Sequence, residues 1–151
     1  MAPGFQPETF PLPITKFNNK KTYDLLRLRE YLVTSKPDVV ILESAQAYPN
    51  QGSVSTFRTG ECYGQITGLV IGLGIELLYI HPKKWQAAML PKNEDTKLAS
   101  IKTAKLLFPD TSLRRTPRCT TDCDGLSDSL LIAEYGRILL DEAEPKNQGN
   151  A

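Results

Sequence analysis

Two aspartates stand four residues apart where the last helix of the chain is expected, in "TTDCDGLSDSLLIAEYGR" (120–137). On a helix, Asp124 and Asp128 fall on the stripe that continues through Leu131 and Ile138. The two carboxylates are therefore predicted to extend an apolar, inward-facing stripe. Two like charges at this spacing repel each other, and they repel more strongly when partly desolvated. A cation is expected between them.

The cation has two possible sources. One is a divalent metal ion, and the other is the basic loop before the helix, with Arg114, Arg115 and Arg118. Capping of the helix is assigned to Thr121 or Asp122, so it explains neither member of the acidic pair. On spacing alone, both interpretations stay open.

A third acid, Glu43, ends the apolar run 39–42. This run predicts a strand buried on both faces, and open α/β sheets bind ligands at the carboxyl ends of their strands. A carboxylate there is costly unless it is paired or binds a metal, although a structural glutamate can also turn into solvent. Three acids at one edge would make an oxygen-rich site that suits Mg²⁺ or Mn²⁺ and phosphodiester cleavage.

Two further polar residues stand at the ends of expected elements, where they could belong to the same site. Lys97, in "NEDTKLAS", begins the penultimate helix, where it would contact a phosphate or position water, or be an ordinary solvated lysine. His81, the single histidine, follows a strand and precedes Pro82, and it is interpreted as structural.

Length and composition indicate an ordinary globular protein. The 151 residues predict one main domain (14–142) between a proline-rich extended start (1–13) and a flexible tail (143–151). No apolar run approaches the roughly 20 residues of a membrane span, and the start lacks a secretory or transit signal.

Three cysteines, without a second pair to complete a zinc site, indicate reduced thiols. We expect an intracellular protein of the cytoplasm or nucleoid, or of an organelle nucleoid.

The net charge of +1 conceals basic segments at 16–21, 81–85 and 114–118. Each segment is either a solvated face or, if the three border one site, part of a phosphate-binding surface. The loop 46–55 after the first acidic strand is the expected place for sequence preference. The candidate DNA contacts are Gln51, Lys83, Lys84, Arg114, Arg115 and Arg118.

Periodicity and breakers predict alternating strands and helices, and hence an α/β domain. Strands are expected at 12–17, 39–42 and 75–80, with a turn at 18–21 after the first. Helices are expected at 22–36 (capped by Thr22), 56–74, 82–90, 93–108 and 120–137.

The helix 56–74 carries glycines at every fourth position: Gly60, Gly64, Gly68 and Gly72. Interior glycines cost about 1 kcal/mol each relative to alanine, so a close approach of another backbone is expected along this stripe. Packing on a sheet of the same chain is one interpretation, and a helix pair across a dimer interface is the other.

The order of these motifs resembles the RuvC-type Holliday-junction resolvases, especially their phage-type and chloroplast branches. A strand ending in Glu ("VVILES") is followed by "FRTGECYGQITGLVIGLGI", "HPKKWQAAM", "DTKLASIKTAKLLFP" and "DGLSDSLLIAEYGR". The similarity covers about residues 10 to 140. Its most specific parts are the "PKKW" at 82–85 and the D-G-x-x-D-x-L-L-I-A helix at 124–133.

The resemblance implies an RNase H-like mixed sheet flanked by helices. It also implies a homodimer that cuts two opposed strands of a four-way junction with Mg²⁺ or Mn²⁺, in DNA recombination and repair. Glu43, Asp124 and Asp128 match three metal-binding acids, and Lys97 matches the active-site lysine of the chloroplast branch. The glycine-striped helix matches one used at the dimer interface.

One family feature has no match in this chain. The family has a fourth acid, an Asp on its first strand, whereas Glu8 lies in the proline-rich stretch and Asp24 follows "LPITKF", which resembles the third strand. The first two strands are thus expected to be absent. Besides a junction endonuclease, the sequence therefore permits a catalytically impaired module that binds junctions, or a nuclease for RNA–DNA hybrids.

Overall fold

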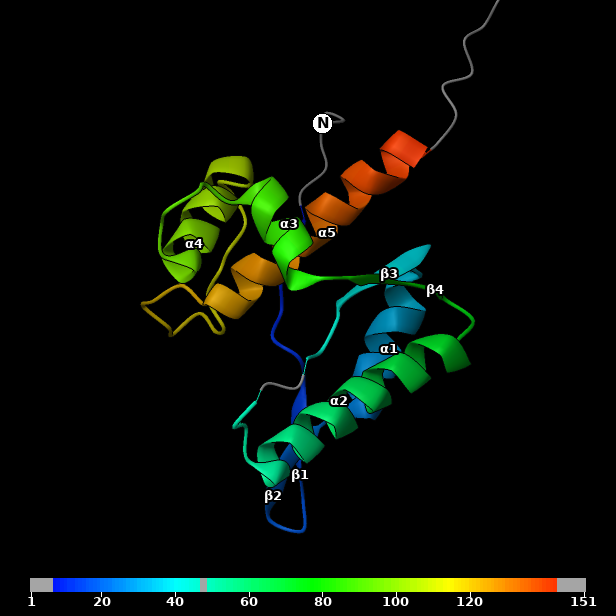
Figure 1. Cartoon of the computed structure of the whole chain (residues 1–151). Coiled ribbons are helices and arrows are strands. Elements are labelled where there is room, and N and C mark those ends of the chain that lie inside the picture. The colour runs from blue at the N-terminus through cyan, green and yellow to red at the C-terminus, as the bar shows by residue number, and fades with distance from the viewer. Residues whose placement is uncertain (1–6, 47–48, 144–151) are drawn as a thin grey trace, which may run out of the picture. The chain divides into compact units, whose positions relative to one another are not determined.

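The computed structural model describes residues 7–46 and 49–143, in two compact units (Figure 1). Residues 11–81 form one unit, and residues 82–143 with 7–10 form the other. The predicted domain 14–142 includes parts of both units, and its bounds stay a prediction. Most of the predicted tail, and residues 1–6 of the proline-rich start, lie outside the described residues.

The 11–81 unit begins with a hairpin of β1 (Ile14–Phe17) and β2 (Lys20–Tyr23). Two residues, Asn18 and Asn19, connect the strands with φ of 48° and 61°. Asparagine tolerates this left-handed region, which both central positions of a tight hairpin turn require. The predicted turn is confirmed at Asn18 and Asn19 but not at 20–21, which pair with β1. The prediction of a helix from Thr22 is wrong, because Thr22 pairs with Thr15 in the hairpin.

Helix α1 (Leu25–Ser35) begins after Asp24, whose carboxylate accepts a hydrogen bond from the Arg27 N–H at 3.1 Å. Asp24, and not Thr22, is therefore the cap of this helix. The helix ends at Lys36, which has a φ of 46° and precedes a proline that cannot continue the helix.

Strands β3 (Val39–Glu43) and β4 (Glu76–Ile80) pair in parallel, with Glu43 opposite Ile80. Helix α2 (Ser53–Gly72) connects them, packs against β4 and runs beside α1 (Figure 1). The residues of β3 are half-buried, which corrects the expectation of a strand buried on both faces. Covering both faces takes more layers than α1 and α2 supply within this unit.

The four glycines of α2 are exposed, and apart from the adjacent residues and the helix's own backbone no described atom lies within 4 Å of a methyl group added at any of them. The interpretation that the stripe packs on a sheet of the same chain is therefore wrong for the part of the chain that the structure describes. Helix α2 instead packs through the face that carries Val70, which is 1% exposed.

The second unit is helical and packs around its last helix. Helices α3 (Pro82–Met89) and α4 (Thr96–Leu107) both contact α5 (Asp124–Ala143) (Figure 1). The largest side chain of this core is Trp85, which is 1% exposed. The other buried apolar side chains of this unit are Ala99, Ala104, Phe108, Leu113, Leu126, Leu130, Leu131 and Ile132. None of the described helices is long and apolar enough to cross a membrane.

Candidate active site

Helix α5 presents the acidic pair from its first and second turns. The helix begins at Asp124, and the backbone carbonyl of Cys123 accepts from the N–H groups of Leu126 and Ser127 at 3.1 and 3.2 Å. Cys123 thus holds the capping position, and the assignment of the cap to Thr121 or Asp122 is wrong. A carboxylate in the first turn of a helix is favoured by the helix dipole.

The stripe predicted for α5 faces inward at Leu131, but the expectation of an inward-facing carboxylate is wrong for Asp124, whose side chain faces solvent. Asp124 and Asp128 are half-buried and continue into Leu131, which is fully buried, while Ile138 is half-buried. The side chain of Asp122 does not belong to this stripe but forms an ion pair with Lys105 of α4.

The cation beside Asp124 is a lysine. Lys97 Nζ of α4 lies 3.3 Å from Asp124 Oδ2, and its hydrogen bond and charge hold the pKa of Asp124 below its usual range. Asp95 caps α4 by accepting from the N–H groups of Lys97 and Leu98 at 3.1 and 3.0 Å, which fixes the start of this helix. The Lys97 side chain is 78% exposed and that of Asp124 is 38% exposed, so the pair faces solvent.

The arginines expected as counter-ions lie in the exposed loop before α5. Arg115 donates from Nε to the sulfur of Cys123 at 3.1 Å, next to Asp124 in the sequence. This contact and the backbone N–H groups of Leu126 and Gly125 lower the pKa of the Cys123 thiol, although its burial acts in the opposite direction. Arg115 therefore lies near the acidic pair, but the ion-pair partner of Asp124 is Lys97.

The second aspartate has a different kind of neighbour. Asp128 Oδ1 accepts a hydrogen bond of 2.5 Å from Ser100 Oγ of α4, and Ser100 is fully buried. Sequence reasoning missed Ser100. The available signal was weak: Ser100 lies four residues before Ala104, so two small residues share one face of the helix and permit close packing.

Two of the remaining predicted site residues, Glu43 and Gln51, belong to the 11–81 unit, as does His81. Glu43 is the half-buried last residue of β3, Gln51 donates to Ser55 Oγ at 3.3 Å, and His81 follows β4 with its Nε2 2.5 Å from Nε2 of Gln46. Because Glu43 and the aspartate pair lie in different units, the predicted three-acid cluster stays a prediction. Among residues 7–46 and 49–143, no group of three or more His, Cys, Asp or Glu side chains could hold a metal ion.

The aspartate pair alone suits a hard cation of the magnesium type. Mg²⁺ commonly binds one or two carboxylates and fills its other positions with waters and substrate phosphate oxygens. Asp124 and Asp128 are half-buried, which leaves room for such ligands on their solvent side. The donor set on α5 therefore fits a metal of this class.

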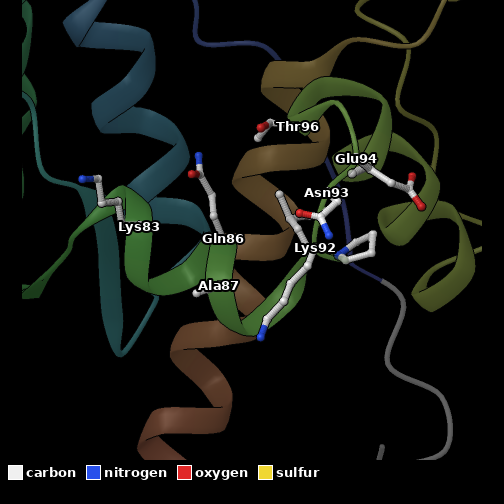
Figure 2. A pocket seen from close by; sticks show the side chains of 10 residues that line it. Lys83, Gln86, Ala87, Lys92, Asn93, Glu94 and Thr96 are labelled. Atoms are coloured by element: carbon white, nitrogen blue, oxygen red, sulfur yellow. The ribbon is translucent and has the colours of Figure 1, made fainter.

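A pocket of about 300 Å³ lies between α3 and the beginning of α4 (Figure 2). Exposed Lys83 borders it, as do Lys92 and Asn93 from the loop that connects the two helices. Lys84, Arg114, Arg115 and Arg118 are also exposed on this unit. Sequence reasoning named the α3 lysines but missed Lys92.

Comparison with known proteins shows the fold. No protein-family model and no curated protein sequence matches the chain. The structure of T. thermophilus RuvC in complex with a Holliday junction substrate superposes with a TM-score of 0.54 and 17% identity, over 76% of this chain and 65% of that one. The Thermus thermophilus RuvC structure superposes with a TM-score of 0.53 and 16% identity, over 84% of this chain and 86% of that one. The chain thus has a RuvC-like, RNase H-like α/β fold, as predicted.

Proposed function

From this RuvC-like fold, we propose that the chain is a metal-dependent, structure-selective DNA endonuclease that resolves four-way (Holliday) junctions. The observation that carries the proposal is the acidic pair at the start of α5, with Lys97 of α4 3.3 Å from its first member. In this cluster, negative ligands for a metal stand beside a positive group for a phosphate. Such a nuclease acts where DNA is kept, inside the cell or in an organelle.

Asp124 and Asp128 would hold Mg²⁺ or Mn²⁺, with Glu43 as a third ligand. A bound metal of this kind activates water and stabilises the departing oxygen in phosphodiester cleavage. Lys97 would exchange its contact with Asp124 for a phosphate oxygen of the substrate, which its 78% exposure permits. Its charge would then act where negative charge increases during cleavage.

The exposed basic residues supply the affinity for branched DNA. Lys83 and Lys84 begin α3, and the three arginines of segment 114–118 lie in the loop before α5. Contacts of lysine and arginine with phosphates position a protein on DNA without reading its sequence. Any sequence preference would come from the loop 46–55 with Gln51; residues 47 and 48 of this loop lie outside the described residues.

A homodimer would place two such sites on the two opposed strands of a junction. Helix α2 supports this part of the proposal, because its glycines are exposed and so are three large apolar side chains, Val54, Phe57 and Ile71. Phe57 is 71% exposed. Such side chains are usually covered by a partner when they gather on one face.

Cleavage of a synthetic four-way junction tests the proposal. We expect cutting with Mg²⁺ or Mn²⁺ and none with EDTA, and little cutting of a linear duplex of the same sequence. Asp128→Asn should abolish cutting. Asp141→Asn is the matched control, because Asp141 lies on the same helix, is 63% exposed and pairs with Arg137. Unchanged cutting by Asp128→Asn would refute the assignment of the metal site.

The alternative is a module that binds junctions without cutting them. The exposed basic residues of the second unit support binding whether or not the acids assemble with a metal. This alternative predicts that junctions shift in a gel with EDTA present and stay intact at every Mg²⁺ or Mn²⁺ concentration. Adding an RNA–DNA hybrid to the substrate panel separates a hybrid-cleaving nuclease from both.

A further inference from the structure

Two fully buried serines meet where α4 packs against α5. Ser100 of α4 and Ser127 of α5 are each 0% exposed, and their hydroxyl oxygens lie 2.9 Å apart. Ser127 also donates to the backbone carbonyl of Asp124 at 2.8 Å. A buried hydroxyl is unfavourable unless it is hydrogen-bonded, and alanine would occupy almost the same space. Both hydroxyls therefore have hydrogen-bond partners. Close packing of the two helices would be possible with alanine at either position, so packing does not explain why hydroxyl groups are present.

The hydroxyl of Ser100 also contacts a carboxylate. Its oxygen lies 2.5 Å from Asp128 Oδ1, across 28 residues of sequence. A serine has one proton to donate, and an ionised carboxylate only accepts. Because the carboxylate oxygen is the closer acceptor, Ser100 donates its O–H to Asp128 and not to Ser127, and hydrogen bonds to carboxylates are among the strong ones. The bond limits the orientation of the Asp128 side chain.

The two aspartates of α5 are thus held in different ways. Asp124 pairs with an exposed cation, the Lys97 ammonium, whose 78% exposure leaves it room to turn away. Asp128 is held by a neutral donor that is fixed in the helix interface and leaves the negative charge in place. A carboxylate has about four lone-pair directions, so the hydrogen bond from Ser100 at Oδ1 is compatible with metal binding.

We propose that Ser100 is a positioning residue for Asp128, holding the carboxylate in the orientation that binds the divalent metal. The inference rests on the proposed function, because it takes Asp128 to be a metal ligand. Hydrogen bonds to metal-binding carboxylates from residues outside the ligand set commonly change metal affinity about 10- to 100-fold. Ser127 lacks such a bond to the Asp128 carboxylate among the described contacts, so it is the matched control.

The test is a Mn²⁺ titration of the full chain, followed by electron paramagnetic resonance of the free ion. Ser100→Ala should weaken Mn²⁺ binding about tenfold or more. Ser127→Ala should leave the affinity unchanged within error. Both variants should lower the unfolding temperature by similar amounts, because each removes one buried hydroxyl from the same interface.

Two further variants at position 100 support the comparison. Ser100→Thr keeps the hydroxyl and should retain the Mn²⁺ affinity of the wild type. If Ser100→Ala does not fold, Ser100→Cys fills the same space with a much weaker donor and should show the loss of affinity. Equal Mn²⁺ affinities of the Ser100→Ala and Ser127→Ala variants would overturn the positioning role.

Asp128→Asn separates this inference from the proposed function. If Asp128→Asn binds Mn²⁺ as the wild type does, Asp128 is not a ligand, and both the metal site and the role of Ser100 are overturned. If Asp128→Asn weakens binding and Ser100→Ala matches Ser127→Ala, only the role of Ser100 is overturned. Weakened binding in both Asp128→Asn and Ser100→Ala supports both.

Discussion

Replacing Lys97 by methionine should change metal binding and DNA cleavage in opposite directions. The lysine ammonium lies 3.3 Å from Asp124 Oδ2, where it competes with any metal for that oxygen. Methionine keeps most of the aliphatic stem and removes the charge. Metal affinity should therefore rise, whereas cleavage should fall because the phosphate loses its positive partner.

The size of the gain in affinity follows from the exposure of the pair. At 3.3 Å in a water-like medium, the Coulomb energy of two unit charges is about 1.3 kcal/mol. Measured energies of exposed pairs are lower, about 0.2 to 1 kcal/mol, and the 78% exposure of Lys97 places this pair in that group. Removing the competing cation should thus tighten Mn²⁺ binding by about 1.5- to 5-fold. Cleavage at saturating metal should fall by about 100-fold.

Mn²⁺ titration and junction cleavage at saturating Mn²⁺ measure the two effects separately. Lys105→Met is the control, because Lys105 lies on the same helix and pairs with Asp122 instead of the acidic pair. It should leave both quantities unchanged. Weaker Mn²⁺ binding by Lys97→Met, or cleavage at the wild-type rate, would refute the reasoning.

Three further predictions concern Asp95, Gly68 and the pair of Asp124 with Lys97. Asp95→Ala removes the cap of α4 and should lower the free energy of unfolding, measured by urea denaturation, by about 0.5 to 2 kcal/mol. An unchanged free energy of unfolding would show that the cap does not stabilise the protein. Gly68→Ala, in open space on α2, should raise the free energy of unfolding of the monomer by about 1 kcal/mol and weaken any dimer formed through the glycine stripe, as sedimentation would show. The ion pair of Asp124 with Lys97 stabilises the fold above the ordinary aspartate pKa of about 3.9, and this contribution is lost as the pH falls through the lowered pKa. The difference in unfolding temperature between the wild type and Lys97→Met should therefore disappear in acid, and a constant difference would contradict the assignment.

The helix and strand assignments that the sequence predicted best are those with a strong local pattern. The run that became β3 is continuously apolar and follows a proline, and the helix that became α4 ends just before Pro109. The hairpin strand β2 was missed because "KKTY" has no apolar alternation, and its pairing with β1 depends on the turn at Asn18 and Asn19. Local pattern cannot predict a strand whose stability comes from its partner.

In the candidate site, too, the sequence predicted the features that depend on local spacing and missed those that depend on packing between helices. By itself, the sequence determined that Asp124 and Asp128 share one face of α5, because the period of a helix fixes this from spacing alone. It could not determine what faces them. The tertiary structure decided that Lys97 neutralises the first and that Ser100, 28 residues away, holds the second, because these contacts depend on how α4 packs against α5. Contacts between helices depend on the volumes and positions of many side chains at once, and no short stretch of sequence carries that information.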